Sequence, residues 1–418
     1  MKTRSNAGRR VYINYLTLIF MLIYGMKSLD GSCISYLSEE LMEALGCSTA
    51  QYSSLSSIYY LSYSLSCLAV GMLTSRVARR KILIVPMTLM TGILSLATSQ
   101  VTTFAGLALC RFFTGFFQGG SFSLMLAILS KNLVSNDYGR RNGIINMGSS
   151  VISTVFGPVL FSYMALYHAW NTAYSITGPI LMALAVILFF TVDEVQIEVQ
   201  KRAAGKNPWK KIVLECLHHP IFMMCLFIGI LETISNLCIG VFAPLYYTDI
   251  MQYDTLTKAS FLSAKGLCNL PLMMIIPALA DRFSVRSVMI GTFMLSLLAP
   301  LTAALLPGTT FSAVILAVLG SAGGATVSLF TYMIPRYALP ERLHGMANGV
   351  ILGVACLIGG TIAPAAMGAL VETGWSIPGI LGLCACTYFL CILLSVFLRV
   401  EKYEPAAEQN ARIALRER

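Results

Sequence analysis

The chain has 418 residues, of which 56% are hydrophobic and only 11% are charged, and its mean hydropathy is +0.74. These values exclude a soluble globular protein, in which about 25% of residues are charged. The formal net charge of +10 would suit a nucleic-acid binder, but the basic residues stand between apolar runs rather than in one patch. We therefore expect anionic lipid headgroups as their partner, and no nucleic acid.

Long apolar runs follow one another along the whole chain. Each is long enough for a helix to cross a hydrocarbon core of about 30 Å, and none shows the alternation of a barrel strand. Only helices and closed barrels satisfy their backbone in lipid, so these runs predict helices. The predicted spans are 11–35, 52–74, 82–100, 104–130, 142–166, 172–192, 219–245, 258–280, 287–306, 311–334, 345–368 and 376–399.

Most of the 29 Lys and Arg residues lie near the termini or in alternate connections between the spans. Cytoplasmic connections carry an excess of Lys and Arg, which predicts a multi-pass protein of the cell membrane with both termini in the cytoplasm. The connections expected outside hold Lys258 at a helix edge. The first of these connections contains Glu39, Glu40 and Glu43, and we expect it to form a short surface helix.

Equivalent residues recur at a fixed separation of 206 residues. The pairs are Arg76 and Arg80 with Arg282 and Arg286, Asn142-Gly143 with Asn348-Gly349, and Pro158 with Pro364. A separation kept at three distant places indicates a duplication, which in a membrane protein predicts two structural halves. The expected domains are an N-terminal bundle (1–192), a cytoplasmic linker (193–217), a C-terminal bundle (218–400) and a cytoplasmic tail (401–418).

The two basic segments resemble the loop motif of the major facilitator superfamily, which runs Gly, three residues, Asp, Arg, one residue, Gly, Arg and Arg or Lys. The matching positions are Gly71, Arg76, Arg79 and Arg80 in the first copy and Asp281, Arg282 and Arg286 in the second. Ser75 and Ala78 depart from the motif. The resemblance implies that the seven matching residues latch the cytoplasmic side when the cavity faces outward.

Two further stretches resemble helix motifs of the same family. Arg111 to Gly115 is similar to its fourth-helix element, and Gly148 to Pro158 to its fifth-helix glycine motif. The fifth-helix motif is associated with antiporters and normally continues with paired glycines, where this chain has Val159 and Leu160. This departure weakens an interpretation as a drug–proton antiporter.

The resemblance implies an all-α membrane fold of twelve transmembrane helices in two pseudo-symmetric six-helix bundles. It also implies a monomeric secondary transporter that works by alternating access, with a cavity lined by the first, fourth, seventh and tenth spans. A twelve-span receptor or enzyme is disfavoured by the repeat and by the missing chemistry, because the sequence has no phosphate-binding loop or nucleophile motif. The twelve cysteines lack metal-ligand spacing. We expect no cofactor, no bound metal and no enzymatic activity.

Charged residues at membrane depth are the candidate site. These residues are Lys27, Asp30, Arg111, Glu232 and Lys265. Each would cost about 2.5–3.5 kcal/mol at a lipid-facing helix centre, so each is expected to face protein or water.

The individual positions leave alternatives open. Lys27 and Asp30 are three residues apart and could form a purely structural pair. Arg111 lies about two turns from the outer end, where it could instead reach the headgroups. Lys265 has no acid nearby in the sequence, so its partner must be another helix or the substrate.

Uncharged polar residues continue the candidate site. Asn269 shares a helix face with Lys265, and Asn236 shares one with Glu232. Polar stripes on the second and fifth spans contain Tyr59, Tyr63 and Asn146. These stripes could equally hold helices together.

The surplus of basic over acidic groups predicts a small organic anion, of the carboxylate type, as substrate. The expected binding residues are Lys27, Tyr59, Tyr63, Arg111, Asn146, Asn236, Lys265 and Asn269. A proton, carried by Asp30 or Glu232, or an exchanged counter-substrate would drive symport or antiport. The alternative is a proton-coupled exporter of amphipathic or cationic drugs, with the two acids as counter-ions.

Overall fold

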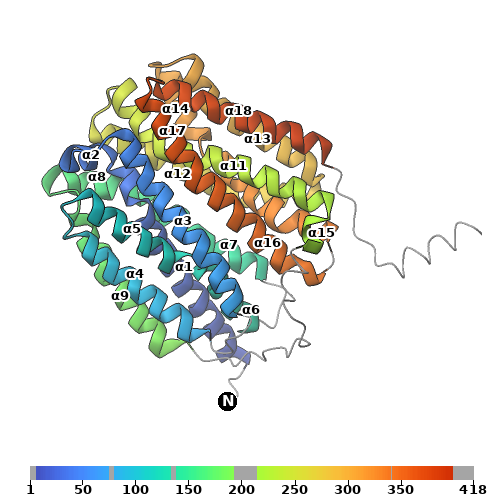
Figure 1. The fold of residues 1–418 in the computed structure, drawn as a ribbon. Coiled ribbons are helices and arrows are strands. Elements are labelled where there is room, and N and C mark those ends of the chain that lie inside the picture. Colours follow the sequence, from blue (N-terminus) through green and yellow to red (C-terminus); the bar gives the residue numbers. More distant parts are fainter. Residues whose placement is uncertain (1–5, 75–79, 133–137, 193–213, 340, 399–418) are drawn as a thin grey trace, which may run out of the picture.

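The structure is a computed structural model that describes residues 6–74, 80–132, 138–192, 214–339 and 341–398. Within these ranges the chain forms helices and no strands (Figure 1). The predicted tail and most of the predicted linker lie outside the described residues. The predicted fold class, an all-α membrane fold, is confirmed.

The first half of the chain contains the helices that lead up to the linker. They are α1 (Asn6–Tyr36), α2 (Ser38–Leu45), α3 (Thr49–Thr74), α4 (Lys81–Thr98), α5 (Phe104–Gln118), α6 (Ser121–Asn132), α7 (Tyr138–Gly148), the π-helix η1 (Ser149–Phe156), α8 (Gly157–Tyr167) and α9 (Thr172–Thr191). The short helix α2 confirms the expectation for the acidic first connection.

The second half repeats this order with more interruptions. It comprises α11 (Pro220–Leu245), the π-helix η2 (Tyr246–Ile250), α12 (Thr255–Arg282), α13 (Val285–Leu305), α14 (Thr310–Leu319), the 3₁₀-helix η3 (Ala322–Thr326), the π-helix η4 (Leu329–Met333), α15 (Ile334–Ala338), α16 (Glu341–Ala355), the π-helix η5 (Cys356–Ile362), α17 (Ala363–Glu372) and α18 (Ile377–Phe397).

Each of the twelve predicted apolar runs coincides with a helix or an interrupted helix. Ten of them, among the described residues, are long and apolar enough to cross a membrane. The other two are α3, which is rich in Ser and Tyr, and the fourth run, which divides into α5 and α6. The fourth run falls short in helix length and not in apolarity, because α5 is apolar but has only 15 residues.

The fourth run was expected to be one helix over 104–130, and this expectation is wrong. It breaks at Gly119 and Gly120, where Gly120 has a φ of 68° that only glycine adopts without strain. The backbone there lies close to α3, because Ser66 Oγ donates a 3.0 Å hydrogen bond to the carbonyl oxygen of Gly119. A side-chain carbon at Gly120 would lie 2.6 Å from Val70 Cβ.

The repeated prolines occupy equivalent places in the two halves. Pro158 stands just after η1, in the first turn of α8, and Pro364 stands just after η5, in the first turn of α17. Proline has no N–H, and its ring crowds the carbonyl group four residues earlier. A widened π-turn relieves this crowding, so the same residue produces the same interruption in both halves.

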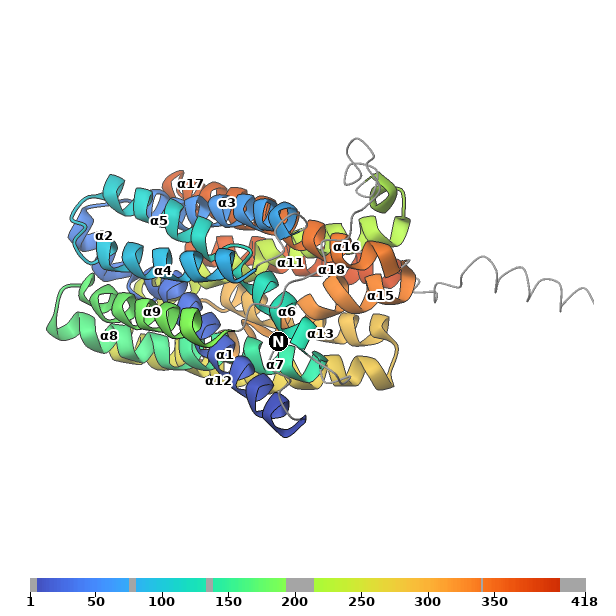
Figure 2. The ribbon, with the colours of Figure 1, turned by 90° about the horizontal axis from the view of Figure 1, so that it is seen from below.

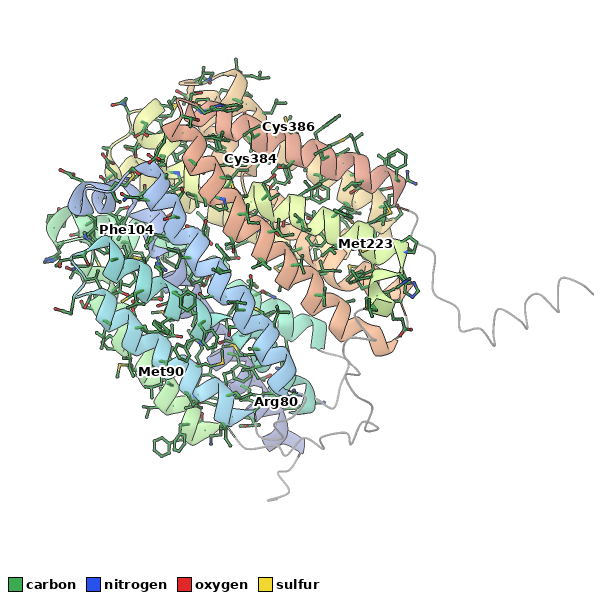
Figure 3. The ribbon with its side chains drawn as sticks, in the orientation of Figure 1. Arg80, Met90, Phe104, Met223, Cys384 and Cys386 are labelled. Carbon is green, nitrogen blue, oxygen red and sulfur yellow. The ribbon has the colours of Figure 1, made fainter. Side chains whose placement is uncertain are left out.

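The two halves form two groups of helices that lie side by side (Figures 1 and 2). One end of the molecule carries α2 and the start of α12, and we call it the α2 end. The opposite end carries α15, the first turn of α1 and the last turn of α18, and we call it the α15 end. Figure 3 shows Arg80 at the start of α4, near the α15 end.

The halves contact each other along two seams. In one seam α3 packs on η5 and α17, where Tyr60 lies against Gly360. In the other seam α12 packs on η1 and α8, and Ser263 Oγ donates a 2.6 Å hydrogen bond to the carbonyl oxygen of Val155. Gly266 permits this approach, because a side-chain carbon there would lie 2.6 Å from the carbonyl carbon of Thr154.

The buried apolar residues show where the halves are joined. One cluster contains core residues of the whole second half, together with first-half residues nearer to α2, such as Leu29, Tyr52 and Phe161. First-half residues nearer to the α15 end, such as Leu16 and Leu129, form a separate cluster. The continuous apolar core that joins the two halves therefore lies towards the α2 end.

Candidate substrate and coupling site

The predicted intramembrane charges lie inside the protein. Lys27, Asp30, Arg111 and Glu232 are all buried, with at most 4% of their surface exposed, and Lys265 is half-buried. Burial of this depth requires hydrogen-bonding partners or an unusual function. The five residues differ in how far these requirements are met.

Arg111 is fully engaged between α1, α3 and α9. Its Nη1 donates to the carbonyl oxygens of Asp30 and Gly31 at 3.3 and 3.1 Å, and its Nη2 donates to the Tyr174 hydroxyl at 3.1 Å. Its guanidinium carbon also lies 5.8 Å from the centre of the Tyr59 ring, within cation–π range. The alternative in which Arg111 reaches the headgroups is therefore wrong, because backbone carbonyl groups inside the bundle hold it.

Lys27 does not pair with Asp30, so the alternative of a purely structural pair is wrong. Its Nζ donates to Ser121 Oγ at 2.9 Å and to the carbonyl oxygen of Phe117 at 3.4 Å. Both acceptors lie at the break between α5 and α6. A cation at the C-terminus of α5 is favoured by the helix dipole and by the carbonyl groups that the break leaves without helical partners.

Asp30 is held by an amide rather than by a cation. Gln118 Nε2 donates to Asp30 Oδ2 at 3.0 Å, and the Tyr59 hydroxyl donates to Gln118 Oε1 at 2.7 Å. Asp30 Oδ1 is buried and has no hydrogen-bond partner among the described residues. The predicted residues Asp30 and Tyr59 thus belong to one network, which Gln118 joins.

Tyrosines extend this network towards the second half. Tyr59, Tyr60 and Tyr63 form a cluster on α3, with ring centres 5.1 to 6.3 Å apart. Tyr24 of α1 packs on Phe122 of α6 with a centre-to-centre distance of 4.7 Å. The predicted site residue Tyr63 is half-buried within this aromatic group.

The second half has a smaller acidic network on α11. Asn236 Nδ2 donates to Glu232 Oε1 at 3.1 Å, which confirms that these two residues share a face. Gly324 of η3 lies beside Asn236, where a side-chain carbon would be 3.1 Å from Nδ2. No Lys or Arg nitrogen of the described residues lies within 4.0 Å of the Glu232 or Asp30 carboxylate oxygens.

Lys265 and Asn269 are the least satisfied polar pair. They lie one turn apart on α12, and the Lys265 ammonium makes no hydrogen bond or ion pair with any described residue. Asn269 is buried, and its Oδ1 also lacks a partner within the described ranges. The backbone at this place is fixed, because Ser321 Oγ donates to the carbonyl oxygen of Lys265 at 3.3 Å.

The remaining predicted residues are only partly described. Asn146 is half-buried in α7, and Arg76 and Arg79 lie outside the described residues.

The other residues of the two basic segments lie at helix ends. Gly71 belongs to the last turns of α3, and Asp281 and Arg282 end α12. Arg80 precedes α4, and partial burial lowers the pKa of its guanidinium. Arg282 is exposed and Arg286 is half-buried.

Lys258 joins the halves at the α2 end. It lies at the start of α12 and is completely buried, and its Nζ is 3.3 Å from Glu39 Oε2 and 3.8 Å from Glu40 Oε2. Both acids belong to α2 of the first half. The acidic connection and the one basic residue expected on the same side therefore form an ion pair between the halves.

Sequence reasoning missed three residues of the site: Gln118, Tyr174 and Ser121. Gln118 follows Arg111 by seven residues, which places both on one helix face and could have identified it. Tyr174 and Ser121 gave no such signal, because their roles depend on contacts with other helices.

The comparison with known families decides the assignment of the chain. The family model of the Major Facilitator Superfamily matches residues 18–360 and 279–417. The chain belongs to the major facilitator superfamily. As a member of this superfamily it is a multi-pass integral membrane protein and a transporter that works by alternating access.

Solved structures of superfamily transporters share the fold. A bacterial homolog of the human lysosomal transporter Spinster, inward-facing and unoccupied, has a TM-score of 0.71 at 17% identity, over 94% of this chain and 99% of that chain. The nucleoside transporter NupG has a TM-score of 0.70 at 14% identity, over 91% of this chain and 97% of that chain. No curated protein sequence matches the chain. At these identities the likeness concerns the fold alone.

Proposed function

We propose that this superfamily member transports a small organic anion of the carboxylate type, driven by protons or by exchange. The observation that carries the proposal is the Lys265 ammonium, which is half-buried and has no partner among the described residues. A substrate carboxylate would neutralise it and accept charge-assisted hydrogen bonds. The Asn269 amide, one turn away, would contribute a neutral hydrogen bond.

Arg111 has a supporting part in this proposal. Its contacts with two carbonyl oxygens and with Tyr174 fix the guanidinium in place, so it would contribute positive potential near the substrate rather than a mobile clamp. Lys27, which is engaged at the helix break, contributes in the same way.

Asp30 and Glu232 are the proposed proton carriers. Each is buried, and each accepts one hydrogen bond from an amide rather than an ion pair. Burial in such surroundings raises the free energy of the ionised carboxylate. Binding of a proton removes this cost, so it stabilises the folded protein more than protonation of an exposed carboxylate would. Protonation of either acid would therefore favour a different arrangement of the helices around it.

Neutralising the acids should separate coupling from transport. In Asp30→Asn or Glu232→Gln, we expect substrate exchange to persist while accumulation driven by a proton gradient falls at least tenfold. The amides keep the size of the acids and remove the site that takes the proton. Uptake and counterflow into proteoliposomes measure the two activities, and full gradient-driven uptake in both variants would contradict this role.

The two unpaired acids also support the alternative, an exporter of amphipathic or cationic drugs, in which they serve as counter-ions of the substrate. A thermal-shift screen of the purified protein against organic acids and lipophilic cations tests the two proposals, because a bound ligand raises the apparent stability. We expect carboxylates to raise the melting temperature. Stabilisation by cations alone would favour the exporter.

We propose that the α15 end faces the cytoplasm of a cell membrane and that both termini lie on that side, as the distribution of Lys and Arg supports. We also propose that the protein works as a monomer. The native Cys47 is a poor probe of this orientation, because it is buried and burial raises the pKa of its thiol. Exposed positions at the two ends of the described helices serve better.

In intact cells, Glu372→Cys at the α2 end should react with an impermeant thiol reagent, and Phe283→Cys at the α15 end should react only after lysis. The parent protein, treated in parallel, gives the background of the native cysteines. Labelling of Phe283→Cys in intact cells would contradict the proposed orientation.

The seven loop residues remain the proposed latch of the α15 end in the alternate state, in which the α2 end is open. The described members support this assignment by their places, because Gly71 lies in the last turns of α3 and Asp281 and Arg282 end α12.

A further inference from the structure

Gln118 links two residues of the proposed coupling site. We infer that Gln118 is a positioning residue, whose amide reverses between two orientations and so holds Asp30 in both its ionised and its protonated state. The inference rests on the proposed role of Asp30 as a proton carrier. It adds the device that lets a buried carboxyl group change charge without losing its partner.

Three side chains are joined by two hydrogen bonds: Tyr59 of α3, Gln118 of α5 and Asp30 of α1. Tyr59 donates to Gln118 Oε1 at 2.7 Å, and Gln118 Nε2 donates to Asp30 Oδ2 at 3.0 Å. Gln118 is 5% exposed and Asp30 is 1% exposed, so water does not readily replace either bond. Gln118 is the last residue of α5, directly before the break at Gly119, which fixes the place of its backbone.

The Gln118 amide and the Tyr59 hydroxyl can each change from hydrogen-bond donor to acceptor or the reverse. An amide has a donor end and an acceptor end, and a phenol hydroxyl both donates and accepts. With Asp30 ionised, the amide N–H₂ faces the carboxylate and the Tyr59 hydroxyl donates to Oε1, as in the structure. When a proton binds to the carboxylate, the new O–H can donate to Oε1 of the reversed amide, whose N–H₂ then donates to the Tyr59 oxygen.

Both arrangements contain two hydrogen bonds, so neither state leaves the amide without a partner in a buried place. An unsatisfied buried group would otherwise penalise one state. The only covalent change is the O–H bond formed when the carboxylate gains one proton, and the two hydrogen bonds of the ionised state are replaced by two others. Leucine at this place could neither donate nor accept. Its presence would favour the neutral acid, because the hydrogen bond lost by the ionised carboxylate is stronger than the one lost by the protonated acid.

Other groups around Asp30 do not replace the amide. Lys27 and Cys33 of α1, Ser95 of α4, Arg111 of α5, Tyr59 of α3 and Tyr174 of α9 are the polar and titratable groups near it. Arg111 contacts the backbone oxygen of Asp30, and Lys27 is bound at Ser121. Neither of these two hydrogen bonds involves the Gln118 side chain, so a change in the pH profile of a Gln118 variant is attributable to the lost amide.

The test is the pH dependence of proton-driven uptake into proteoliposomes. Gln118→Leu removes the N–H donor that stabilises the ionised carboxylate of Asp30. Asp30 should therefore keep its proton to higher pH, and the midpoint of the pH profile should rise by about one unit. In Tyr59→Phe the amide keeps its donor for the ionised acid but loses its anchor, so the rise should be smaller. Gln51→Leu, which changes an exposed amide in the first turn of α3, should keep the wild-type midpoint.

The outcomes separate this inference from the proposed function. If wild-type uptake does not depend on the proton gradient, the proposed coupling fails, whatever the variants do. If the wild type is proton-driven and folded Gln118→Leu keeps its midpoint, the positioning role is overturned and the role of Asp30 stands. Should Gln118→Leu fail to fold, an unchanged midpoint in Tyr59→Phe overturns the inference equally.

Discussion

Lys265→Gln should weaken the binding of the organic anion at least tenfold, which is the largest loss expected of any single change at the site. The ammonium makes no hydrogen bond or ion pair with the described part of the chain, so the substrate carboxylate would be its main partner. A hydrogen bond to a charged group contributes about 1.5–3 kcal/mol, and 1.4 kcal/mol corresponds to a factor of ten in affinity. Thermal shift and radiolabelled binding to the purified protein measure this loss.

Lys27→Gln is the matched comparison for this prediction. Lys27 carries the same charge at membrane depth, but Ser121 and the carbonyl group of Phe117 already hold it. Its replacement should lower the melting temperature, because the break between α5 and α6 loses its cation, and should reduce affinity less than Lys265→Gln does. Equal losses of affinity in the two variants would show that Lys265 has no special contact with the substrate.

Lys258→Gln should open the α2 end more often. Lys258 is completely buried and bridges to Glu39 and Glu40 of the other half. Removing one partner of a buried ion pair costs about 3–5 kcal/mol, and less where the acids are partly exposed as here. This energy stabilises the arrangement with a closed α2 end, so its loss shifts the population towards the alternate arrangement.

The shift can be read at Ser53, which is buried where α3 meets Gly368 of the second half. A thiol reagent should modify Ser53→Cys about tenfold faster when Lys258→Gln is also present. Lys258→Arg should keep the slow rate, and so should Glu43→Gln, which neutralises an exposed acid of α2. Equal rates in Ser53→Cys alone and in its three combinations with Lys258→Gln, Lys258→Arg and Glu43→Gln would show that the ion pair does not control the opening of the α2 end.

The fold could be predicted from the sequence because its signals are local or periodic. Apolar runs long enough to cross a membrane and a separation of 206 residues between equivalent positions do not require knowledge of packing. The break at Gly119 and Gly120 was missed, because the flanking residues are as apolar as a continuous helix would need. Its cause is the close approach of α3, which is a tertiary contact.

The site could be predicted only in part. The free-energy cost of a charge at membrane depth identified the charged residues as candidates, but it does not determine which partner each of them has. Lys27 and Asp30 have the spacing of a helical pair, yet Lys27 binds the broken fourth span and Asp30 binds Gln118. Helical spacing brings two side chains within reach of each other, and the neighbouring helices decide whether they pair.

The most direct test of the central claim is uptake of radiolabelled small carboxylates by purified protein in proteoliposomes, with and without a proton gradient. We expect that a carboxylate accumulates in protein-containing vesicles, that accumulation depends on the gradient, and that Lys265→Gln abolishes most of it. Lipophilic cations should not be transported. Gradient-driven movement of such cations, undiminished by Lys265→Gln and lost in Glu232→Gln, would contradict transport of an organic anion and establish the exporter instead.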